Sequence, residues 1–545
     1  MRTGSSRAGR GRSACLALLL GATALHAQYS ISTLPSPDSD ANDLFGMDVD
    51  VRGGRVIVGA SGASYDQSFP FGDIPAAGTV YIYSKVGGAW SLESQLWPSD
   101  LEALAGYGHG VGIDGDRAVA GAPFKDEPSF PGTGILYVLR LSQGAWMQEA
   151  KLKVAPVPEG AQFGYSAAIE GTTVVGGAPF FNEPPGVMGA LWVFRLVPGQ
   201  GWKQLAHLVN ASKTHAQRLG MSVALSGDTI LGGAPGWGCV GPPNTCTGAA
   251  FVFREVGGTW QEEATLAPAD GEYQDQFGFG VDIEGDVAVV GSQLDDDLGS
   301  DSGSTYVFRR TGTTWAQEAK LLPCDGAPGA NFGRSVAVSG DTIIVGAALD
   351  PEGAGGGAAY VFRREDGAWE EVGKIVLPGT AGAQAGAAAG IDGAVAAIGA
   401  PSDDAAAHDA GRGWVAEDVS VHPTWSSLSG GLAGQAGVAT LSGTGTLAGA
   451  TPVTLSLAGA APLALSTLVV GLDMLCVPFK GGLLVPVPDV LIGGLVTDAG
   501  GAWSLGGTWP PGVPSGFDVL LQAWTSDAAG PHGLAASGAL EAHAP

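Results

Sequence analysis

Charged residues are scarce in this 545-residue chain, and basic residues are the scarcest: 26 lysines and arginines stand against 53 aspartates and glutamates. The net charge of −27 disfavours phosphate backbones, so we expect no nucleic-acid partner. The low charge does not indicate disorder, because 45% of the residues are hydrophobic. The 90 glycines argue against long helices. This composition is typical of many short strands joined by tight turns.

Long hydrophobic runs are also missing. After the N-terminus, no segment has eighteen uninterrupted apolar residues, so we expect no membrane span. The N-terminus places four arginines before an apolar stretch, Ala14–Leu25, that is too short to cross a bilayer. This pattern predicts a signal peptide over residues 1–27 and a protein that is secreted or held at the cell surface.

The sequence lacks recognisable catalytic patterns. Its eight histidines are scattered, and none belongs to a His-Glu-x-x-His pair or a Gly-x-Ser-x-Gly elbow. We interpret His109, which stands in one copy of a repeat described below, as a packed or surface histidine. These gaps favour a binding protein over an enzyme.

Cysteines are few, five in all. Cys239 and Cys246 lie seven positions apart in one loop, which predicts a disulfide in an oxidising compartment. Zinc is the weaker interpretation, because no histidine or further cysteine stands near them. Cys324 and Cys476 are far apart in sequence. We expect them to be free buried thiols, and the alternative is a bridge between two domains.

One motif is abundant, because it occurs seven times before residue 421. Each copy begins with an opening pair, has a turn glycine eight positions later, and ends with a closing pair fourteen positions after it began. The copies are 53 to 62 residues apart, so a rigid unit alternates with loops of variable length. The opening pairs are Phe45-Gly46, Tyr107-Gly108, Phe163-Gly164, Leu219-Gly220, Phe277-Gly278, Phe332-Gly333 and Ala385-Gly386. The closing pairs are Gly59-Ala60, Gly121-Ala122, Gly177-Ala178, Gly233-Ala234, Gly291-Ser292, Gly346-Ala347 and Gly399-Ala400.

Each copy predicts four antiparallel strands. The turn glycine suits a type II′ hairpin between the first two strands, and an aromatic third strand and a Trp-led fourth strand follow. Seven such units predict a β-propeller over residues 28–421. The seventh copy lacks a Trp-led strand, and residues 28–35 resemble one, so we expect the N-terminal strand to close blade seven.

Two recurrent features of these copies are interpreted as structural. The glycines of the closing pairs are expected to be packing residues near the axis. Arginines often end the third strand and glutamates often occur in the fourth, which predicts cross-strand pairs.

The motif resembles FG-GAP repeats, which are found in the integrin α-subunit propeller and in many secreted bacterial proteins. The resemblance covers roughly residues 28–420 and is carried by Phe277-Gly278 followed by Gly291, and by Phe163-Gly164 followed by Gly177-Ala178-Pro179. It implies a seven-bladed propeller that acts in recognition or adhesion. Integrin-like repeats often carry a calcium loop between opening and closing pairs, but here this interval holds only a two-residue turn, so that function does not carry over.

The long connections between second and third strands are expected to gather on one face, and they are acidic. Their densest run contains Asp295, Asp297 and Asp301. Clustered carboxylates predict a calcium site there, and the alternative is a solvated acidic loop that opposes aggregation. No other cofactor is expected.

Residues 424–545 carry few charges and alternate at the period of a strand, which predicts a small C-terminal β-sandwich and an all-β chain. Three functions stay open. The first is a secreted, monomeric, non-catalytic protein that binds a protein or glycan through its acidic loop face. The second is a lyase or hydrolase acting on extracellular polysaccharide, which carboxylates, histidine or tyrosine converging in the axial pocket would favour. The third is a structural component of the envelope.

Overall fold

The computed structural model describes most of the chain between residues 29 and 544. The chain divides into two compact units, Tyr29–Val421 and a second one that begins at His422. The described ranges are 29–37, 40–65, 74–126, 131–154, 159–183, 187–210, 218–236, 247–351, 356–365, 367–420, 424–428, 431–472, 474–480, 482–515 and 517–544. The predicted signal peptide and the predicted Cys239–Cys246 disulfide lie outside these ranges.

The first unit consists of seven four-stranded antiparallel sheets. Blade one consists of β2 (Phe45–Arg52), β3 (Arg55–Ala60), β4 (Thr79–Val86) and β5 (Ala89–Leu96). Blade two consists of β6 (Val111–Asp114), β7 (Arg117–Ala122), β8 (Ile135–Ser142) and β9 (Ala145–Leu152). Blade three consists of β10 (Ala167–Glu170), β11 (Thr173–Glu183), β12 (Val187–Val197) and β13 (Gly201–Leu208). Blade four consists of β14 (Val223–Ser226), β15 (Thr229–Ala234), β16 (Ala249–Val256) and β17 (Thr259–Leu266). Blade five consists of β18 (Phe277–Glu284), β19 (Val287–Ser292), β20 (Ser304–Thr311) and β21 (Thr314–Leu321). Blade six consists of β22 (Phe332–Ser339), β23 (Thr342–Ala347), β24 (Ala358–Glu365) and β25 (Ala368–Val376).

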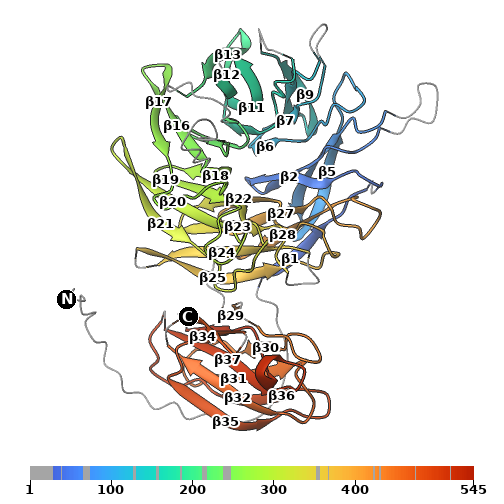
Figure 1. The fold of residues 1–545 in the computed structure, drawn as a ribbon. Helices are drawn as coiled ribbons and strands as arrows, with labels where there is room; N and C mark the ends of the chain where they lie inside the picture. Colours follow the sequence, from blue (N-terminus) through green and yellow to red (C-terminus); the bar gives the residue numbers. More distant parts are fainter. Residues whose placement is uncertain are drawn as a thin grey trace. The chain divides into compact units, whose positions relative to one another are not determined.

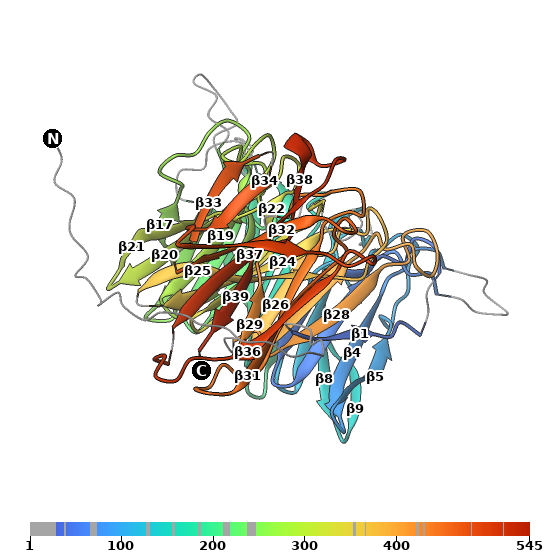
Figure 2. The same ribbon diagram turned by 90° about the horizontal axis from the view of Figure 1, so that it is seen from below.

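Blade seven combines the two ends of this unit. Its sheet has the order β1-β28-β27-β26, formed by β26 (Ala388–Asp392), β27 (Val395–Ala400), β28 (Arg412–Glu417) and the N-terminal strand β1 (Ser30–Leu34). Strand β1 pairs antiparallel with β28, from Ser30 opposite Glu417 to Leu34 opposite Gly413. Figures 1 and 2 both show β1 beside β28. The strand is therefore the outer strand of the last blade, in the position that the sequence pattern predicts.

The blades form a closed ring, because the same contact occurs at every junction. In each case the residue that opens one blade makes a parallel β-bridge to the glycine before the third strand of the preceding blade. The bridges are Phe45–Gly411, Tyr107–Gly78, Phe163–Gly134, Leu219–Gly189, Phe277–Gly248, Phe332–Gly303 and Ala385–Gly357. The first of these joins blade one to blade seven. The predicted seven-bladed propeller is thereby confirmed.

The repeated glycines are explained by backbone contact between neighbouring blades. A Cβ atom on the closing glycine Gly59 would lie 1.9 Å from the carbonyl oxygen of the opening glycine Gly108, in the next blade. A Cβ on Gly399 would lie 2.1 Å from the oxygen of Gly46, across the ring closure. No side chain fits at such a seam, so both positions require glycine. These glycines are packing residues, as expected, but they pack at blade boundaries.

The turn glycines have positive φ angles in all seven blades. Six are followed by a residue with negative φ, as a type II′ hairpin requires. In blade one both Gly53 and Gly54 have positive φ, 60° and 75°, which is the type I′ form.

The C-terminal unit is a two-layer β-sandwich. One layer is a six-stranded sheet and the other a three-stranded sheet, β30-β31-β36. Leu455 and Leu457 of the smaller sheet share a core with Leu468, Val519 and other residues of the larger one. The strands are β29 (Trp425–Ser427), β30 (Thr440–Thr444), β31 (Pro452–Ala458), β32 (Leu465–Gly471), β33 (Met474–Phe479), β34 (Gly482–Pro486), β35 (Val490–Val496), β36 (Trp503–Thr508), β37 (Asp518–Ser526), β38 (Leu534–Ala536) and β39 (Leu540–His543). The predicted sandwich is confirmed.

Two expectations that concern the whole chain are also answered. Cys324 and Cys476 are disulfide-bonded, so the expectation that they are free thiols is wrong. In the described part of the chain, no helix has the length and hydropathy that a bilayer span would need.

Candidate functional site

The three aspartates predicted to bind calcium lie on the loop between β19 and β20, and the structure brings only two of them together. The Nζ atom of Lys320, on β21, lies 3.1 Å from Oδ2 of Asp295 and 2.7 Å from Oδ2 of Asp297. The Asp301 carboxylate instead lies within 3.4 Å of the Ser300 hydroxyl, which donates to it. An ammonium group thus supplies positive charge to Asp295 and Asp297. Calcium binding by the three residues stays a prediction.

The same cluster recurs in blade six. Lys374 Nζ lies 2.7 Å from Asp325 Oδ2 and 3.0 Å from Asp350 Oδ1, and the Tyr360 hydroxyl donates to both aspartates. In blade two, Lys151 and the Tyr137 hydroxyl bind Asp100 in the same way. Several acidic side chains near the loops are therefore buried partners of lysines, and the view of these loops as wholly solvated is wrong.

A second group of potential metal ligands lies on the loop between β27 and β28. Among the described residues, Asp404, His408 and Asp409 place potential ligand atoms within 4.8 Å of one another. His408 Nδ1 lies 3.1 Å from the Asp409 carboxylate, and its side chain is 75% exposed. The group is a short, largely exposed loop cluster with no further feature that points to an ion.

The first strands of all seven blades line a cavity of about 320 Å³ on the axis of the ring. Each first strand is an edge of its sheet, so half of its backbone groups face away from the sheet. All seven strands run from an opening pair to a turn glycine, which gives the cavity two different ends. We call these the collar end and the turn end.

At the turn end, polar groups satisfy one another from blade to blade. The side chain before one turn glycine accepts a hydrogen bond from the turn-glycine N–H of the next blade. These contacts are Asp392–Gly53, Asp114–Gly171, Glu170–Gly227, Ser226–Gly285, Glu284–Gly340 and Ser339–Gly393. Blade one has Arg52 at this position, and its guanidinium lies 3.6 Å from Asp114 and 3.5 Å from Glu170. These contacts link neighbouring blades around the turn end.

Three carboxylates line the middle of the cavity and cap exposed strand edges. Asp48 and Asp50 accept the N–H groups of Val111 and Ile113, each at 2.8 Å, and Asp282 accepts that of Val338 at 2.7 Å. Burial raises the pKa of Asp48 and of Asp282 to about 7, and it also raises the pKa of Asp50. These aspartates join blade one to blade two and blade five to blade six.

The collar end is formed by the residue two positions after each opening residue. This collar consists of Met47, His109, Tyr165, Met221, Phe279, Arg334 and Ala387. Loop aromatics extend it: the Phe124 ring lies 6.0 Å from that of His109, and the Phe180 ring lies 6.1 Å from that of Tyr165. Phe124 is 42% exposed. The collar is thus mostly apolar and aromatic, with three polar side chains in it.

His109 is neutral and oriented. Its Nδ1 lies 2.8 Å from the carbonyl oxygen of Tyr165, and burial lowers the pKa of its imidazole. Nδ1 must carry the proton to donate to a carbonyl, which leaves Nε2 as an acceptor. Its ring also packs on Tyr165, with centroids 4.2 Å apart. His109 is therefore part of the collar rather than a surface residue.

Arg334 is the cation of the collar, and the sequence did not single it out. Its guanidinium lies 5.5 Å from the centre of the Phe279 ring. In the described part of the chain, no carboxylate lies within ion-pair distance of it, and its buried Nε has no hydrogen-bond partner. Burial lowers the pKa of Arg334. Burial also raises the pKa of Tyr165, and the positive charges of Arg334 and Arg218 counteract part of that rise. Arg334 and Arg218 thus both place positive charge near Tyr165.

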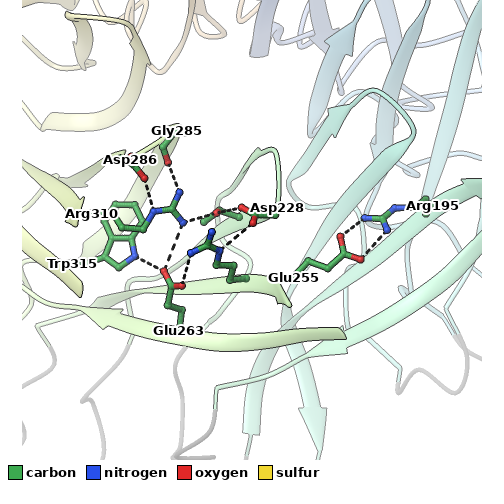
Figure 3. Close-up of polar contacts among 10 residues, drawn as sticks. Arg195, Asp228, Glu255, Glu263, Gly285, Asp286, Arg310 and Trp315 are labelled. Atoms are coloured by element: carbon green, nitrogen blue, oxygen red, sulfur yellow. Dashed lines mark hydrogen bonds and ion pairs between the residues drawn. The ribbon is translucent and has the colours of Figure 1, made fainter. Parts of the chain in front are cut away.

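The basic residues of the outer strands behave differently, because they have carboxylate partners. Arg195 of blade three lies 2.7 Å from Glu255 of blade four, and Arg310 lies 2.6 Å from Asp286 (Figure 3). Trp315 Nε1 donates to Glu263 of the preceding blade at 2.9 Å. The predicted cross-strand pairing occurs, as between Arg309 and Glu318, and further contacts of this kind cross the blade seams.

The comparisons with known proteins agree with this fold. The FG-GAP repeat family model matches residues 90–139, 260–308 and 315–362. Each match runs from the start of one outer strand to the third strand of the next blade. No curated protein sequence matches the chain.

Solved propellers are similar at low identity. The periplasmic gluconolactonase PpgL of Pseudomonas aeruginosa is 14% identical over 59% of this chain and 82% of its own, with a TM-score of 0.38. The β-propeller domain of the Trilobed protease from Pyrococcus furiosus, which has an open velcro topology, is 11% identical over 69% of this chain and 95% of its own, with a TM-score of 0.41.

Proposed function

Because the chain is an FG-GAP repeat β-propeller protein, we propose that it is an exported, non-catalytic binding protein whose glycan ligand enters the collar end of the axial cavity. The observation that carries this proposal is the aromatic collar itself. Phe279 and Tyr165 line a cavity of about 320 Å³, at the low end of the range for ligand pockets. Phe124 and Phe180 extend the aromatic surface from the rings of His109 and Tyr165. Aromatic faces of this kind pack well against sugar rings.

The proposal moves the binding surface from the acidic loops to the collar. The loop carboxylates Asp295 and Asp350 are buried partners of Lys320 and Lys374, so they are not available for a ligand. The polar side chains of the turn end are engaged in contacts between blades. Export is supported by the basic and apolar pattern of residues 1–27 and by the disulfide-bonded Cys324 and Cys476.

The test is a glycan array probed with the full secreted chain and two matched variants. Phe124→Ala removes an exposed collar ring without opening a core, and it should weaken binding to any glycan hit at least about tenfold. Asp301→Asn alters an exposed loop carboxylate and should leave binding unchanged. The opposite pattern would place recognition on the acidic loops and overturn the proposal.

A lyase is the second candidate, favoured by one specific observation. His109 presents an unprotonated Nε2 in the same collar as Arg334 and as Tyr165, on whose ring it packs. In a uronate, a base removes the C5 proton, the electron pair forms the C4–C5 double bond, and the C4–O bond breaks with a proton passing to the leaving oxygen. Incubation with polyuronates and detection of the unsaturated product by its ultraviolet absorbance decides between the two candidates.

A further inference from the structure

We propose that the collar binds the carboxylate of a uronic-acid residue, and that Arg334 is the residue that anchors it. The inference rests on the proposed glycan site and names the chemical class of its ligand. It starts from the distribution of positive charge in a chain that has twice as many acidic as basic residues.

The other buried cations of the described propeller have anionic partners. Lys374, with 3% of its side chain exposed, contacts Asp325 and Asp350. Arg310, with 10% exposed, contacts Asp286 and Glu263. Even Arg52, in the same axial cavity as Arg334, has two carboxylates nearby. Arg334 differs from all of them, although acidic residues are plentiful.

An unpaired buried guanidinium costs free energy, so packing alone does not explain Arg334. The aromatic face of Phe279 offsets part of that cost through a cation–π contact. Asp282, on the first strand of the preceding blade, has its two oxygens bound to the N–H groups of Ile283 and Val338. The hydrogen-bonding groups of Arg334 are thus left for an anion that the chain itself does not provide.

The surroundings indicate which anion fits. A guanidinium binds a planar carboxylate through two parallel hydrogen bonds. At the collar end of the cavity the lining supplies one cation, Arg334, with a neutral imidazole and a tyrosine, whereas Arg218 lies outside the lining, 5.8 Å from the centre of the Phe180 ring. A single negative charge therefore suits the lining better than a phosphate dianion. The ring of Phe279 lies against Arg334, and the ring of Phe124 lies beside His109, so both offer aromatic surface at the collar end where the remainder of a sugar would pack. A carboxylate carried by a sugar satisfies both requirements.

The experiment measures binding of the full chain by isothermal titration calorimetry. The probes are an oligouronate, its methyl ester, and a sulfated neutral oligosaccharide of the same length. We expect the oligouronate to bind, and methyl esterification or Arg334→Met to weaken binding at least about tenfold. Arg52→Gln, a matched change at the turn end, should leave the affinity within about twofold of the wild type.

Thermal melting without ligand separates a binding role from a structural one. Arg334→Met should melt at the wild-type temperature or above it, because it removes an uncompensated charge. A lower melting temperature, equal binding of the methyl ester, tighter binding of the sulfated probe, or unchanged binding by Arg334→Met would each overturn the proposal. If Phe124→Ala abolishes binding of a neutral glycan while Arg334→Met does not, the glycan site stands and the uronate assignment falls.

Discussion

Two cations of blade six, Lys374 and Arg334, differ in their surroundings. Lys374, on the outer strand β25, is enclosed by Asp325, Asp350 and the Tyr360 hydroxyl. Arg334, on the innermost strand β22, lies on the ring of Phe279 with no carboxylate in ion-pair distance among the described residues. The charge of Lys374 is compensated by carboxylates of the chain itself, whereas a bound anion would compensate the charge of Arg334. In this propeller, an ion pair with a carboxylate marks a basic residue that stabilises the fold, and we propose that the lack of one marks a basic residue that binds a ligand.

The ring must be closed for this difference to exist, because Arg334 faces Tyr165 of blade three across the axis. Deletion of residues 29–36 removes β1, including Leu34 and Tyr29, which are 2% and 4% exposed. Loss of two such side chains should cost about 3–6 kcal/mol. We expect the melting temperature to fall by roughly 10 °C, and ligand binding at the collar to fall with it.

Differential scanning calorimetry measures this effect, and Ser30→Ala is the control, because that side chain is exposed on the same strand. A deletion variant that melts like the wild type would show that β1 does not hold the ring together.

Removal of the paired cation should be the next largest effect. Lys374→Met leaves Asp325 and Asp350 buried without their ammonium partner, which should cost about 3–5 kcal/mol of unfolding free energy. Urea denaturation measures the loss, and the double variant Lys374→Met with Asp350→Asn should recover part of it. If Lys374→Met is as stable as the wild type, pairing does not separate the two cations of blade six.

Asp282 is an acidic counterpart to these two cations, because its buried carboxyl group accepts hydrogen bonds from backbone N–H groups. Asp282→Asn should destabilise the protein by about 1–3 kcal/mol, because the N–H of Val338 loses its carboxylate. The pKa of Asp282 is raised from 3.8 to about 7 in the folded protein. The stability that this group contributes is therefore complete below pH 3.8 and is lost as the pH rises through 7.

The deficit of Asp282→Asn relative to the wild type should accordingly be larger at pH 5 than at pH 8, by about 1 kcal/mol or more. Parallel urea denaturation of both proteins at the two pH values measures it. Glu284→Gln, whose carboxylate lies at the exposed turn end, should show a small deficit at either pH. An equal deficit at the two pH values would mean that Asp282 is ionised throughout.

The fold was predictable because its constraints occur in every copy. Closing glycines such as Gly59 touch opening glycines such as Gly108, so any side chain there would break a seam. A requirement of the backbone that is repeated seven times is visible in one sequence. The outer strand of blade seven could be predicted for the same reason. The seventh copy lacks a fourth strand, and the N-terminal segment before the first copy resembles one.

The site was much harder to predict, because one copy carries what the others lack. Arg334 occupies a position that holds Met47, Phe279 or Ala387 in other blades, so it looks like ordinary variation. Aligning the second residue after each opening residue would have shown one arginine at a position that is otherwise mostly apolar or aromatic. The partners of Asp295 could not be found in this way, since Lys320 reaches it from a different strand.

The pairing of β1 with β28 also fixes an order of events. Ser30 and its partner Glu417 are about 390 residues apart, so β1 leaves the ribosome long before the strand it must join. At about 5–20 residues per second, that interval is roughly 20 to 80 s of synthesis. An unpaired edge strand is open to pairing with another chain for all of that time. A cell that makes this protein thus has to keep its first strand apart from other chains until its seventh blade exists.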